Sequence, residues 1–259
     1  ILSIDASTQN VYHFSDTDKN ISLLDISETF GTYDGSFVLY DNNLDSWKIY
    51  DLEEATKRIP PESTYKIYDA LLGLESGIIT PEHSSMTWNG DAFPFPSWEA
   101  DQDLNSAMQN SVNWYFQAID SQLGINRVQE FLNKIEYGNQ TTSSNLDLYW
   151  SDFSLKISPL EQVTLLKKFN TNEFHLNFQN VFSVKNAIKI ASTPNGNFYG
   201  KTGTGRVNGQ DINGWFIGYV ETSDNSYYFA TNIQSDSNAT GKKAFEITSD
   251  ILKKLHIWN

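Results

Sequence analysis

The sequence predicts an α+β fold, in which an antiparallel sheet is flanked by helices and joined to an all-helical lobe. Strand-like segments lie toward both ends of the chain, whereas its long middle has helical periodicity. Strands separated in this way, without room for parallel crossovers, must pair with one another in antiparallel fashion. We expect a single domain, because 259 residues suffice for one large core. The sheet would comprise about 1–60 and 193–259 and the helical lobe about 61–192, with the ligand cleft between them.

The first part of the chain predicts a β-hairpin after a weakly patterned start. Residues 1–34 are polar and mixed, and they suit a short helix and an edge strand. Residues 37–40 and 47–50 are aromatic and β-branched runs, and the residues between them, 41–45, have turn chemistry. Two such runs around a polar turn are typical of a β-hairpin.

The middle of the chain predicts helices. Two prolines at 60–61 break the chain, and apolar residues then recur at helical spacing over 63–77. Similar periodicity marks segments near 103–122, 126–136 and 159–169. These segments form the predicted helical lobe.

The last part of the chain returns to strands and ends in a helix. Residues 198–201, 215–221 and 227–233 are strand-like, and 222–225 form a turn between the last two. From about 241 to 255, apolar residues follow one helical face. The sheet is therefore completed by segments from both ends of the chain.

Composition excludes several classes of function. The chain has no cysteine, which excludes disulfides, thiolate metal sites and cysteine nucleophiles. Its net charge is −14 without a basic run, which argues against a nucleic-acid partner. No segment approaches the ~20 apolar residues of a membrane-spanning helix. The four histidines have no neighbour at metal-ligand spacing, so we expect no metal site and place them on the surface.

The segment 63–66 pairs a hydroxyl with an amine. Ser63 and Lys66 are three residues apart at the predicted start of a helix, a spacing that places their Cβ atoms roughly 5–6 Å apart. Lysine can act as a base beside serine if its pKa falls from ~10.4. The pattern S-x-x-K is a signature of serine enzymes that react with penicillin. Chance alone could produce it in a chain of this length, so other segments must decide.

A second candidate segment is Ser111-Val112-Asn113 in the helical middle. Both polar side chains can reach a cleft if the backbone there is a turn or a helix end, and the Ser111 hydroxyl could then relay a proton to a leaving nitrogen. The alternative is an ordinary N-cap serine beside a solvated Asn113.

The third candidate is the run Lys201-Thr202-Gly203-Thr204-Gly205 at a strand end. Lysine supplies positive charge, threonine supplies a hydroxyl, and glycine allows a ligand to lie against the strand backbone. A substrate that carries a carboxylate could bind there as an additional strand. The alternative is an ordinary strand that runs into a glycine turn.

A fourth segment, Tyr137-Gly138-Asn139, precedes Tyr149-Trp150. A helix C-cap at Gly138, followed by a loop with a buried tryptophan, explains these residues without any function. We prefer that interpretation for Gly138 in particular.

Together these motifs resemble the penicillin-recognising serine proteins. The ordered set S-x-x-K, S-x-[VN], Y-G-N and K-T-G is most similar to the class D β-lactamases and to the sensor domains of BlaR and MecR penicillin receptors. The resemblance covers roughly residue 35 to the C-terminus. The phrases Ser-Thr-Tyr-Lys-Ile-Tyr at 63–68 and Ser-Val-Asn-Trp-Tyr at 111–115 look like the sensors rather than the hydrolases. The implied fold is that of serine β-lactamases and penicillin-binding transpeptidases.

The resemblance implies how a β-lactam would react. Ser63 would attack the β-lactam carbonyl and become acylated, with Lys66 as its base. Lys66 would first take up CO2 as an N-carbamate (N6-carboxylysine), which makes CO2 the only cofactor expected. Ser111 would pass the proton toward the ring nitrogen, and Trp150 aligns with a tryptophan that steadies the carbamate in the hydrolases.

The same resemblance implies how the substrate would be held. Lys201 and Thr202 would bind its carboxylate. The backbone N–H groups of Ser63 and Thr204 would form the oxyanion hole, where donors meet charge that develops only in the transition state.

Asn113 distinguishes a sensor from a hydrolase. Class D enzymes usually have Val at this position, and apolar surroundings keep a lysine deprotonated so that its carbamate survives. We hypothesise that Lys66 loses CO2 once Ser63 is acylated and then pairs with Asn113, so that no base activates water. Ser151, where the hydrolases often have Leu, would remove another apolar wall. The alternatives are a class D β-lactamase, a penicillin-binding peptidase, and a scaffold domain in which Ser63 never reacts.

The sensor family also implies a setting for the domain. Its members are membrane proteins with an outward-facing penicillin-binding domain and an intracellular zinc protease. This sequence begins at Ile1 without a signal peptide or a His-Glu-x-x-His motif, and we expect it to be the excised extracellular domain. Its partners would be β-lactam antibiotics and the membrane-embedded remainder of the receptor, and the excised domain would be monomeric.

Overall fold

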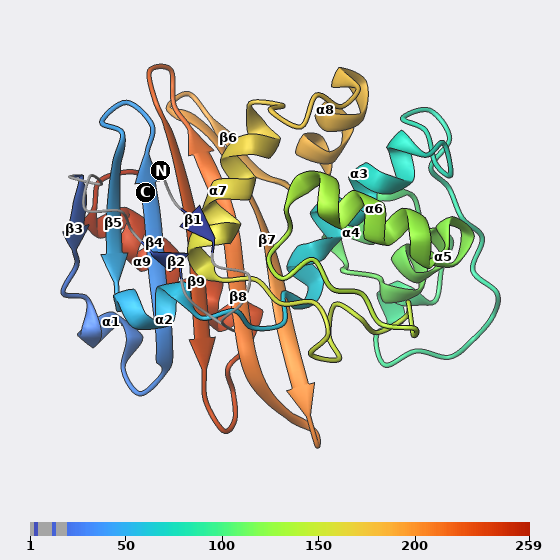
Figure 1. Ribbon diagram of the computed structural model, residues 1–259, viewed down its shortest axis with the longest axis horizontal. Helices are drawn as coiled ribbons and strands as arrows, with labels where there is room; N and C mark the ends of the chain where they lie inside the picture. The colour runs from blue at the N-terminus through green and yellow to red at the C-terminus, as the bar shows by residue number, and fades with distance from the viewer. Residues whose placement is uncertain (1–2, 5–11, 14–19) are drawn as a thin grey trace.

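The computed structural model describes residues 3–4, 12–13 and 20–259, and its architecture is the predicted mixture of a sheet and helices (Figure 1). One sheet has the strand order β3-β5-β4-β9-β8-β7-β6, while β1 (Ser3–Ile4) and β2 (Tyr12–His13) pair separately. The sheet strands are β3 (Ile21–Leu23), β4 (Asp34–Asp41), β5 (Ser46–Tyr50), β6 (Lys189–Thr193), β7 (Gly196–Val207), β8 (Gln210–Glu221) and β9 (Ser226–Gln234).

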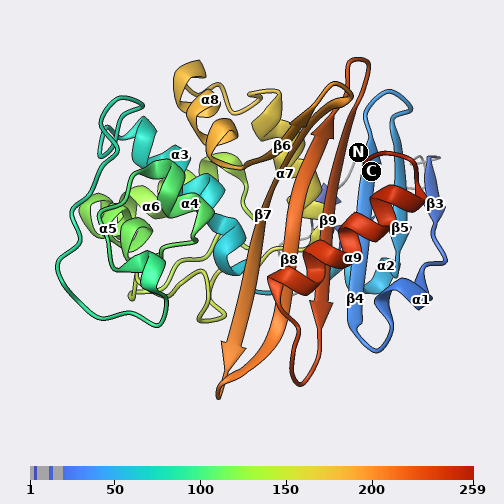
Figure 2. The same cartoon turned by 180° about the vertical axis from the view of Figure 1, so that it is seen from behind.

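The helices fall into two groups, those that cover the sheet and those of the helical part next to it (Figures 1 and 2). The first group comprises α1 (Ser27–Phe30), α2 (Leu52–Thr56), α7 (Pro159–Asn170) and α9 (Gly241–Lys254). The others are α3 (Lys66–Glu75), α4 (Leu104–Gln109), α5 (Asn113–Leu123), α6 (Ile125–Ile135) and α8 (Phe178–Ala187), with short 3-10 turns η1 (Glu62–Tyr65) and η2 (Pro96–Trp98).

The predicted hairpin and C-terminal strands are confirmed, and one pairing differs. The strands β4 and β5 pair antiparallel, as do β7, β8 and β9 in succession. The edge strand β3, however, runs parallel to β5, so this one pair departs from the predicted antiparallel arrangement. The chain passes through α1 and β4 between these two strands, and that detour provides the crossover that a parallel pair needs.

The weakly patterned start was interpreted as a short helix and an edge strand. Both are present, as α1 and β3. Residues 1–2, 5–11 and 14–19 lie outside the described part of the chain. Within the described part, no helix combines the length and apolar character needed to cross a membrane.

The sheet is covered on both faces. Helix α9 packs on one face over a core that includes Phe37, Phe216 and Phe229 (Figure 2). Helix α7 packs on the other face against β4 and β9. Because both faces are covered, β4 is buried along almost its whole length and has no polar face.

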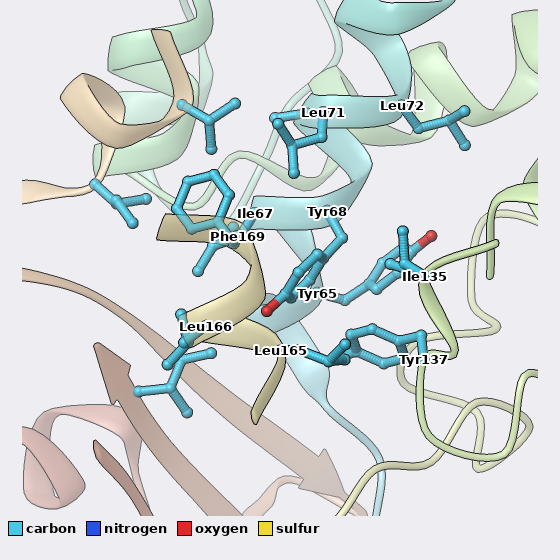
Figure 3. Close-up of a cluster of buried hydrophobic side chains, with 14 of the residues drawn as sticks. Tyr65, Ile67, Tyr68, Leu71, Leu72, Ile135, Tyr137, Leu165, Leu166 and Phe169 are labelled. Atoms are coloured by element: carbon cyan, nitrogen blue, oxygen red, sulfur yellow. The ribbon is translucent and has the colours of Figure 1, made fainter. Parts of the chain in front are cut away.

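The second core joins the sheet to the helices. Figure 3 shows Tyr65, Leu71 and Tyr137 of the helical side in one cluster with Leu166 and Phe169 of α7. Helix α7 therefore lies between the sheet and α3. The predicted helical lobe, 61–192, includes this sheet-packed helix and the start of β6 at Lys189.

The segment near 103–122, for which helical periodicity predicted helix, forms two helices. Helix α4 ends at Gln109, and Ser111 has a left-handed backbone (φ 53°) before the extended N-cap Val112 starts α5. This break turns Ser111 and Asn113 toward the same cleft.

Helix α8 was not predicted as a separate helix from the sequence.

The predicted C-cap at Gly138 was wrong. Helix α6 ends at Ile135, and Glu136 takes the left-handed cap conformation instead. Gly138 also has a positive φ (51°), and a Cβ atom there would lie 1.9 Å from the carbonyl oxygen of Lys156. Glycine is required because two backbone segments nearly touch.

Candidate active site

A cleft of ≈ 440 Å³ lies where η1, the α4–α5 break and β7 meet. It is open to solvent, and it contains most of the residues predicted from the motifs. The lining includes Ser63, Ser111, Asn113, Thr202 and Thr204 from those motifs, together with Phe95 and Trp98 from the loop that contains η2.

Lys66 lies at the centre of the predicted chemistry. As the first residue of α3, it is fully buried, and its Nζ lies 2.7 Å from Ser63 Oγ. Nζ also donates a hydrogen bond of 2.7 Å to Asn113 Oδ1. Burial, with a smaller contribution from the charge of Lys201, lowers the pKa of Lys66 well below its usual value. A neutral amine in contact with a serine hydroxyl is suited to act as a general base.

Aromatic rings enclose the Lys66 amine. Nζ lies 4.2 Å from the ring centroid of Trp150 and 5.6 Å from that of Phe116. The Trp150 indole N–H points elsewhere, because Nε1 donates to the carbonyl oxygen of Asp147 at 3.1 Å. Trp150 therefore offers Lys66 the face of its ring, which attracts a cation rather than an anion.

Lys201 and Ser111 form a second polar pair. Lys201 is 5% exposed, and its Nζ donates to Ser111 Oγ and to the carbonyl oxygen of Thr202, both at 3.0 Å. Burial lowers the pKa of Lys201 to about 7. The Ser111 hydroxyl is thus held beside a cation at the edge of the cleft, where it can exchange a proton with a bound group.

Two residues of the site have strained backbones. Glu62 (φ 52°) and Ser111 (φ 53°) are non-glycine residues in the left-handed region, a conformation that costs on the order of 1–3 kcal/mol. Glu62 is held by bonds from its N–H to the carbonyl oxygen of Trp150 (3.1 Å) and from Asn213 Nδ2 to its Oε1 (3.2 Å). Burial raises the pKa of Glu62 to about 8, so its carboxyl group is neutral beside Ser63 at pH 7.

The glycines of the K-T-G segment allow η1 to touch β7. A Cβ atom at Gly203 would lie 3.2 Å from the backbone nitrogen of Ser63, and one at Gly205 would lie 2.4 Å from Glu62 Oε1. Thr204 lies between them, and its Oγ1 accepts a hydrogen bond from the backbone N–H of Gly241 (2.9 Å). The strand backbone thus approaches the Ser63 backbone closely, as an oxyanion hole built from both would require.

The comparisons with known proteins assign this arrangement to a family. The model of the penicillin binding protein transpeptidase domain matches residues 33–253. The chain belongs to this family. The predicted resemblance to BlaR and MecR sensors and to class D β-lactamases, and the predicted transpeptidase-like fold, are confirmed.

Individual members of the transpeptidase-domain family show how close the relation is. The regulatory protein BlaR1 of Bacillus licheniformis is 46% identical over 92% of this chain and 40% of that protein. The methicillin resistance mecR1 protein of Staphylococcus aureus (strain Mu50 / ATCC 700699) is 42% identical over 88% of this chain and 39% of that protein. The chain therefore spans about two fifths of the length of these relatives.

Solved structures of family members have the same fold as this chain. The C-terminal domain of the Bacillus licheniformis BlaR penicillin-receptor superposes with a TM-score of 0.90 at 46% identity, covering 93% of this chain and 98% of that one. The class D β-lactamase BAT-2 superposes with a TM-score of 0.85 at 36% identity, covering 91% and 97%. The fold is therefore shared by receptors and hydrolases, and only the site can separate them.

The Y-G-N segment of this family member is a structural clamp. Asn139 donates to the carbonyl oxygen of Ser154 (2.7 Å) and accepts from the backbone N–H of Lys156 (2.9 Å). It thereby fixes the end of the loop that carries Trp150, which is buried as expected. Ser151 is exposed and donates to the carbonyl oxygen of Leu148, so the structure does not support its predicted role as a lost wall beside Lys66.

Several residues of the site were not anticipated. Phe95 and Trp98 form an aromatic wall of the cleft, with ring centroids 5.2 Å apart, and Trp98 donates to the carbonyl oxygen of Asn110 (3.0 Å). The aromatic run at 93–98 was the available signal for this wall. Glu62 carries no such signal, because its role depends on the left-handed turn before Ser63.

Other side chains behave as simple surface residues. His83, His175 and His256 are exposed, in accord with the prediction for them, while the side chain of His13 lies outside the described part. Among the described residues, no group of histidine and carboxylate side chains is arranged to hold a metal ion.

Proposed function

We propose that this chain is the extracellular β-lactam-sensing domain of a BlaR/MecR-type receptor, which is acylated stably at Ser63 and thereby signals induction of resistance. The observation that carries the proposal is the pair of 2.7 Å contacts that join Lys66 Nζ to both Ser63 Oγ and Asn113 Oδ1. The first contact suits acylation. The second engages the same nitrogen with a polar partner that would oppose its reuse as a base.

Acylation begins with Lys66 as the base, as the amine or as its N-carbamate. Ser63 Oγ forms a bond to the carbonyl carbon of the β-lactam as its proton passes to Lys66. The C–N bond of the ring then breaks, and the nitrogen takes up a proton through the Ser111 hydroxyl, which Lys201 holds in place. The proton that Ser63 gave to Lys66 is returned through Ser111 to the former ring nitrogen, so that none is gained or lost.

The same cleft supplies groups for binding. Lys201 and Thr202 would hold the carboxylate of the drug, and the backbone N–H groups of Ser63 and Thr204 would stabilise the developing oxyanion. Phe95 and Trp98 provide an apolar wall for the drug's side chain. These roles match those that the family resemblance implied.

Persistence of the adduct follows from what surrounds Lys66. A carbamate on Lys66 would compete with the Asn113 hydrogen bond, and the Trp150 indole N–H is already bonded to Asp147. Lys66 would therefore lose CO2 after acylation and keep its bond to Asn113. Without a base, water attacks the ester slowly and the acyl-enzyme persists.

The relatives support the receptor setting. The similar proteins include a regulatory protein BlaR1 and a BlaR penicillin-receptor. An outward-facing domain joined to a membrane-embedded remainder, and a monomeric state of the isolated domain, belong to this proposal.

A chromogenic cephalosporin tests the proposal when turnover and intact mass are followed together. We expect one stoichiometric burst and a stable adduct, which Ser63→Ala abolishes. Ser97→Ala, which changes another serine of the cleft, is the matched control and should still be acylated. Sustained turnover would overturn the sensor proposal in favour of a class D β-lactamase. That alternative is supported by 37% identity to the probable beta-lactamase YbxI of Bacillus subtilis (strain 168). A fluorescent penicillin that leaves the protein unlabelled would instead favour a scaffold domain.

A further inference from the structure

Two carboxyl groups are buried next to the Lys66 end of α3. Asp69 follows Lys66 by three residues on α3, and Asp120 lies on α5, which packs against α3. Both side chains are 0% exposed. In the described part of the chain, neither has a cationic partner at salt-bridge distance. Buried carboxyl groups without cations are rare, because burying an unpaired charge is costly.

The hydrogen bonds of this pair are incomplete unless a proton lies between the two groups. Asp120 Oδ1 accepts from the Tyr149 hydroxyl at 3.3 Å, whereas Asp120 Oδ2 and both oxygens of Asp69 have no donor among the described residues. Each carboxyl group is among the groups that shift the pKa of the other, so the two are neighbours. Two neighbouring carboxylates repel one another, but a carboxylic acid can donate to a carboxylate.

The surroundings favour a singly protonated pair. Burial raises the pKa of both groups, that of Asp120 to about 7 and that of Asp69 well above its usual range. The titratable groups nearby are Lys66, the buried hydroxyls of Tyr65, Tyr115 and Tyr149, and the exposed Asp147. Lys66 is the one basic group among them, so the pair's remaining negative charge acts mainly on whether Lys66 is protonated or carbamylated.

That charge bears on the modification of Lys66. Carbamylation joins the amine nitrogen to the carbon of CO2, and one N–H proton is lost to a base. The product replaces a neutral or cationic group with an anion. Residues three apart on a helix share a face, so this anion would form near the buried pair. A negative charge there favours the ammonium form and disfavours the carbamate.

We propose that Asp69 and Asp120 share one proton and that the single negative charge of the pair opposes carbamylation of Lys66. The proposal rests on the proposed function of Ser63 and Lys66. It gives a second reason, besides the Asn113 hydrogen bond, why Lys66 would lose its carbamate: the negative charge of the aspartate pair. Asp69 and Asp120 are positioning residues, because they act through Lys66 and not on the drug.

The test measures the carbamate directly by 13C NMR of protein equilibrated with 13C-bicarbonate. The double variant Asp69→Asn/Asp120→Asn removes the charge and preserves shape, and it should raise the apparent affinity of Lys66 for CO2 by about ten- to a hundredfold. Either single variant leaves one carboxyl group that can still carry the charge. Asp250→Asn, an exposed residue of α9, makes the same change in net charge and should have no effect. Tyr149→Phe removes the hydrogen bond to Asp120 without removing charge and should have little effect.

A fluorescent penicillin separates the two proposals. If wild-type protein is not labelled, the proposed function fails. If it is labelled and the carbamate signal is equal in wild type and in Asp69→Asn/Asp120→Asn, this inference fails alone. Should that double variant not fold, Asp69→Asn/Asp120→Leu removes the same charge and carries the test.

Discussion

The chemistry of the cleft depends on which partner holds the nitrogen of Lys66. Ser63 Oγ and Asn113 Oδ1 lie at equal distances from it, and the ring of Trp150 covers it. In the proposed mechanism, the serine contact makes Lys66 a base before acylation. Once Ser63 is an ester, the amide oxygen of Asn113 remains as a polar partner.

Replacing Asn113 tests this competition. In Asn113→Val the hydrogen bond to Lys66 is lost and the surroundings become apolar, so the amine can regain CO2. We expect deacylation to accelerate about ten- to a hundredfold, the factor that corresponds to one hydrogen bond to a charged group. The lifetime of the adduct by intact mass measures this. Asn110→Ala, in the same cleft, is the control, and an unchanged lifetime in Asn113→Val would exclude Asn113 from the mechanism.

Lys201 predicts a pH dependence of acylation. Its pKa is lowered to about 7 by burial, so its positive charge is present below that pH and is lost as the pH rises through it. The second-order acylation rate constant for a drug with a carboxylate should therefore fall between pH 7 and 9. Lys201→Arg should keep its charge and flatten this limb, because a guanidinium does not deprotonate there. A wild-type rate constant that is flat over this range would contradict the assignment.

Asp120 predicts a pH dependence of stability. Burial raises its pKa in the folded state from 3.8 to about 7, so the folded protein binds more protons than the unfolded chain between these values. The free energy of unfolding contributed by Asp120 therefore falls as the pH rises from about 4 to 7. At pH 8, Asp120→Asn should be more stable than wild type by about 1–3 kcal/mol in urea unfolding. A variant that is less stable at pH 8 but not at pH 4 would contradict this sign.

The sequence was informative about residues that belong to motifs. Ser63, Lys66, Ser111 and Lys201 were predicted together and do meet around one cleft. Asp69 and Asp120 could not be recognised, because aspartates on a helix are usually solvated. Their burial depends on how α3 and α5 pack, which no local pattern reveals.

At the scale of elements, the site depends on the contact between η1 and β7. The K-T-G segment lies so close to η1 that a side chain at Gly203 would press on the Ser63 backbone and on Pro61. The strand therefore fixes the position of Ser63, the proposed nucleophile, as well as one wall of the cleft.

Gly203→Ala should separate positioning from stability. Its Cβ would lie 3.2 Å from the Ser63 nitrogen, so the backbone must shift by a few tenths of an ångström. We expect the acylation rate constant to fall about tenfold or more, since small misplacements of reacting groups are costly, with a modest loss of stability. Gly73→Ala, which meets the side chain of Ile119 in the core, is the control. It should alter thermal stability and leave acylation unchanged, and the reverse pattern would contradict this account.

Regular elements were predicted better than their junctions. The hairpin β4–β5, the strands β8 and β9, and helix α9 follow from periodicity and turn chemistry. The division between α4 and α5 does not, because it depends on a serine in a conformation usually taken by glycine. The direction of β3 was also hidden, since three residues cannot indicate which neighbour they will pair with.

At the scale of the whole molecule, the sheet and the helical part share one core. Buried residues from β4 and β5, from α7 and from α3 to α6 belong to the same cluster. The predicted single domain should therefore unfold as one cooperative unit.

Unfolding experiments test whether the sheet and the helical part unfold together. Far-UV circular dichroism and tryptophan fluorescence should report the same transition in urea. Leu166→Ala in α7, which is 0% exposed, should lower the free energy of unfolding by about 2–5 kcal/mol and shift both signals equally. Leu44→Ala, at a leucine that is 65% exposed, should change it by less than about 0.5 kcal/mol. Two separated transitions would show that the sheet and helices fold independently.

The burial of Lys201 has a consequence for how an antibiotic arrives. The chain carries a net charge of −14, while the lysine that would hold the drug's carboxylate is almost hidden from solvent. An anionic drug therefore approaches a repulsive field and meets attraction only on contact. Dissolved salt screens such fields over about 10 Å at 0.1 M. Under the proposed function, encounter with such a drug should therefore become faster as ionic strength rises, opposite to steered association, and the acylation rate constant should rise with salt.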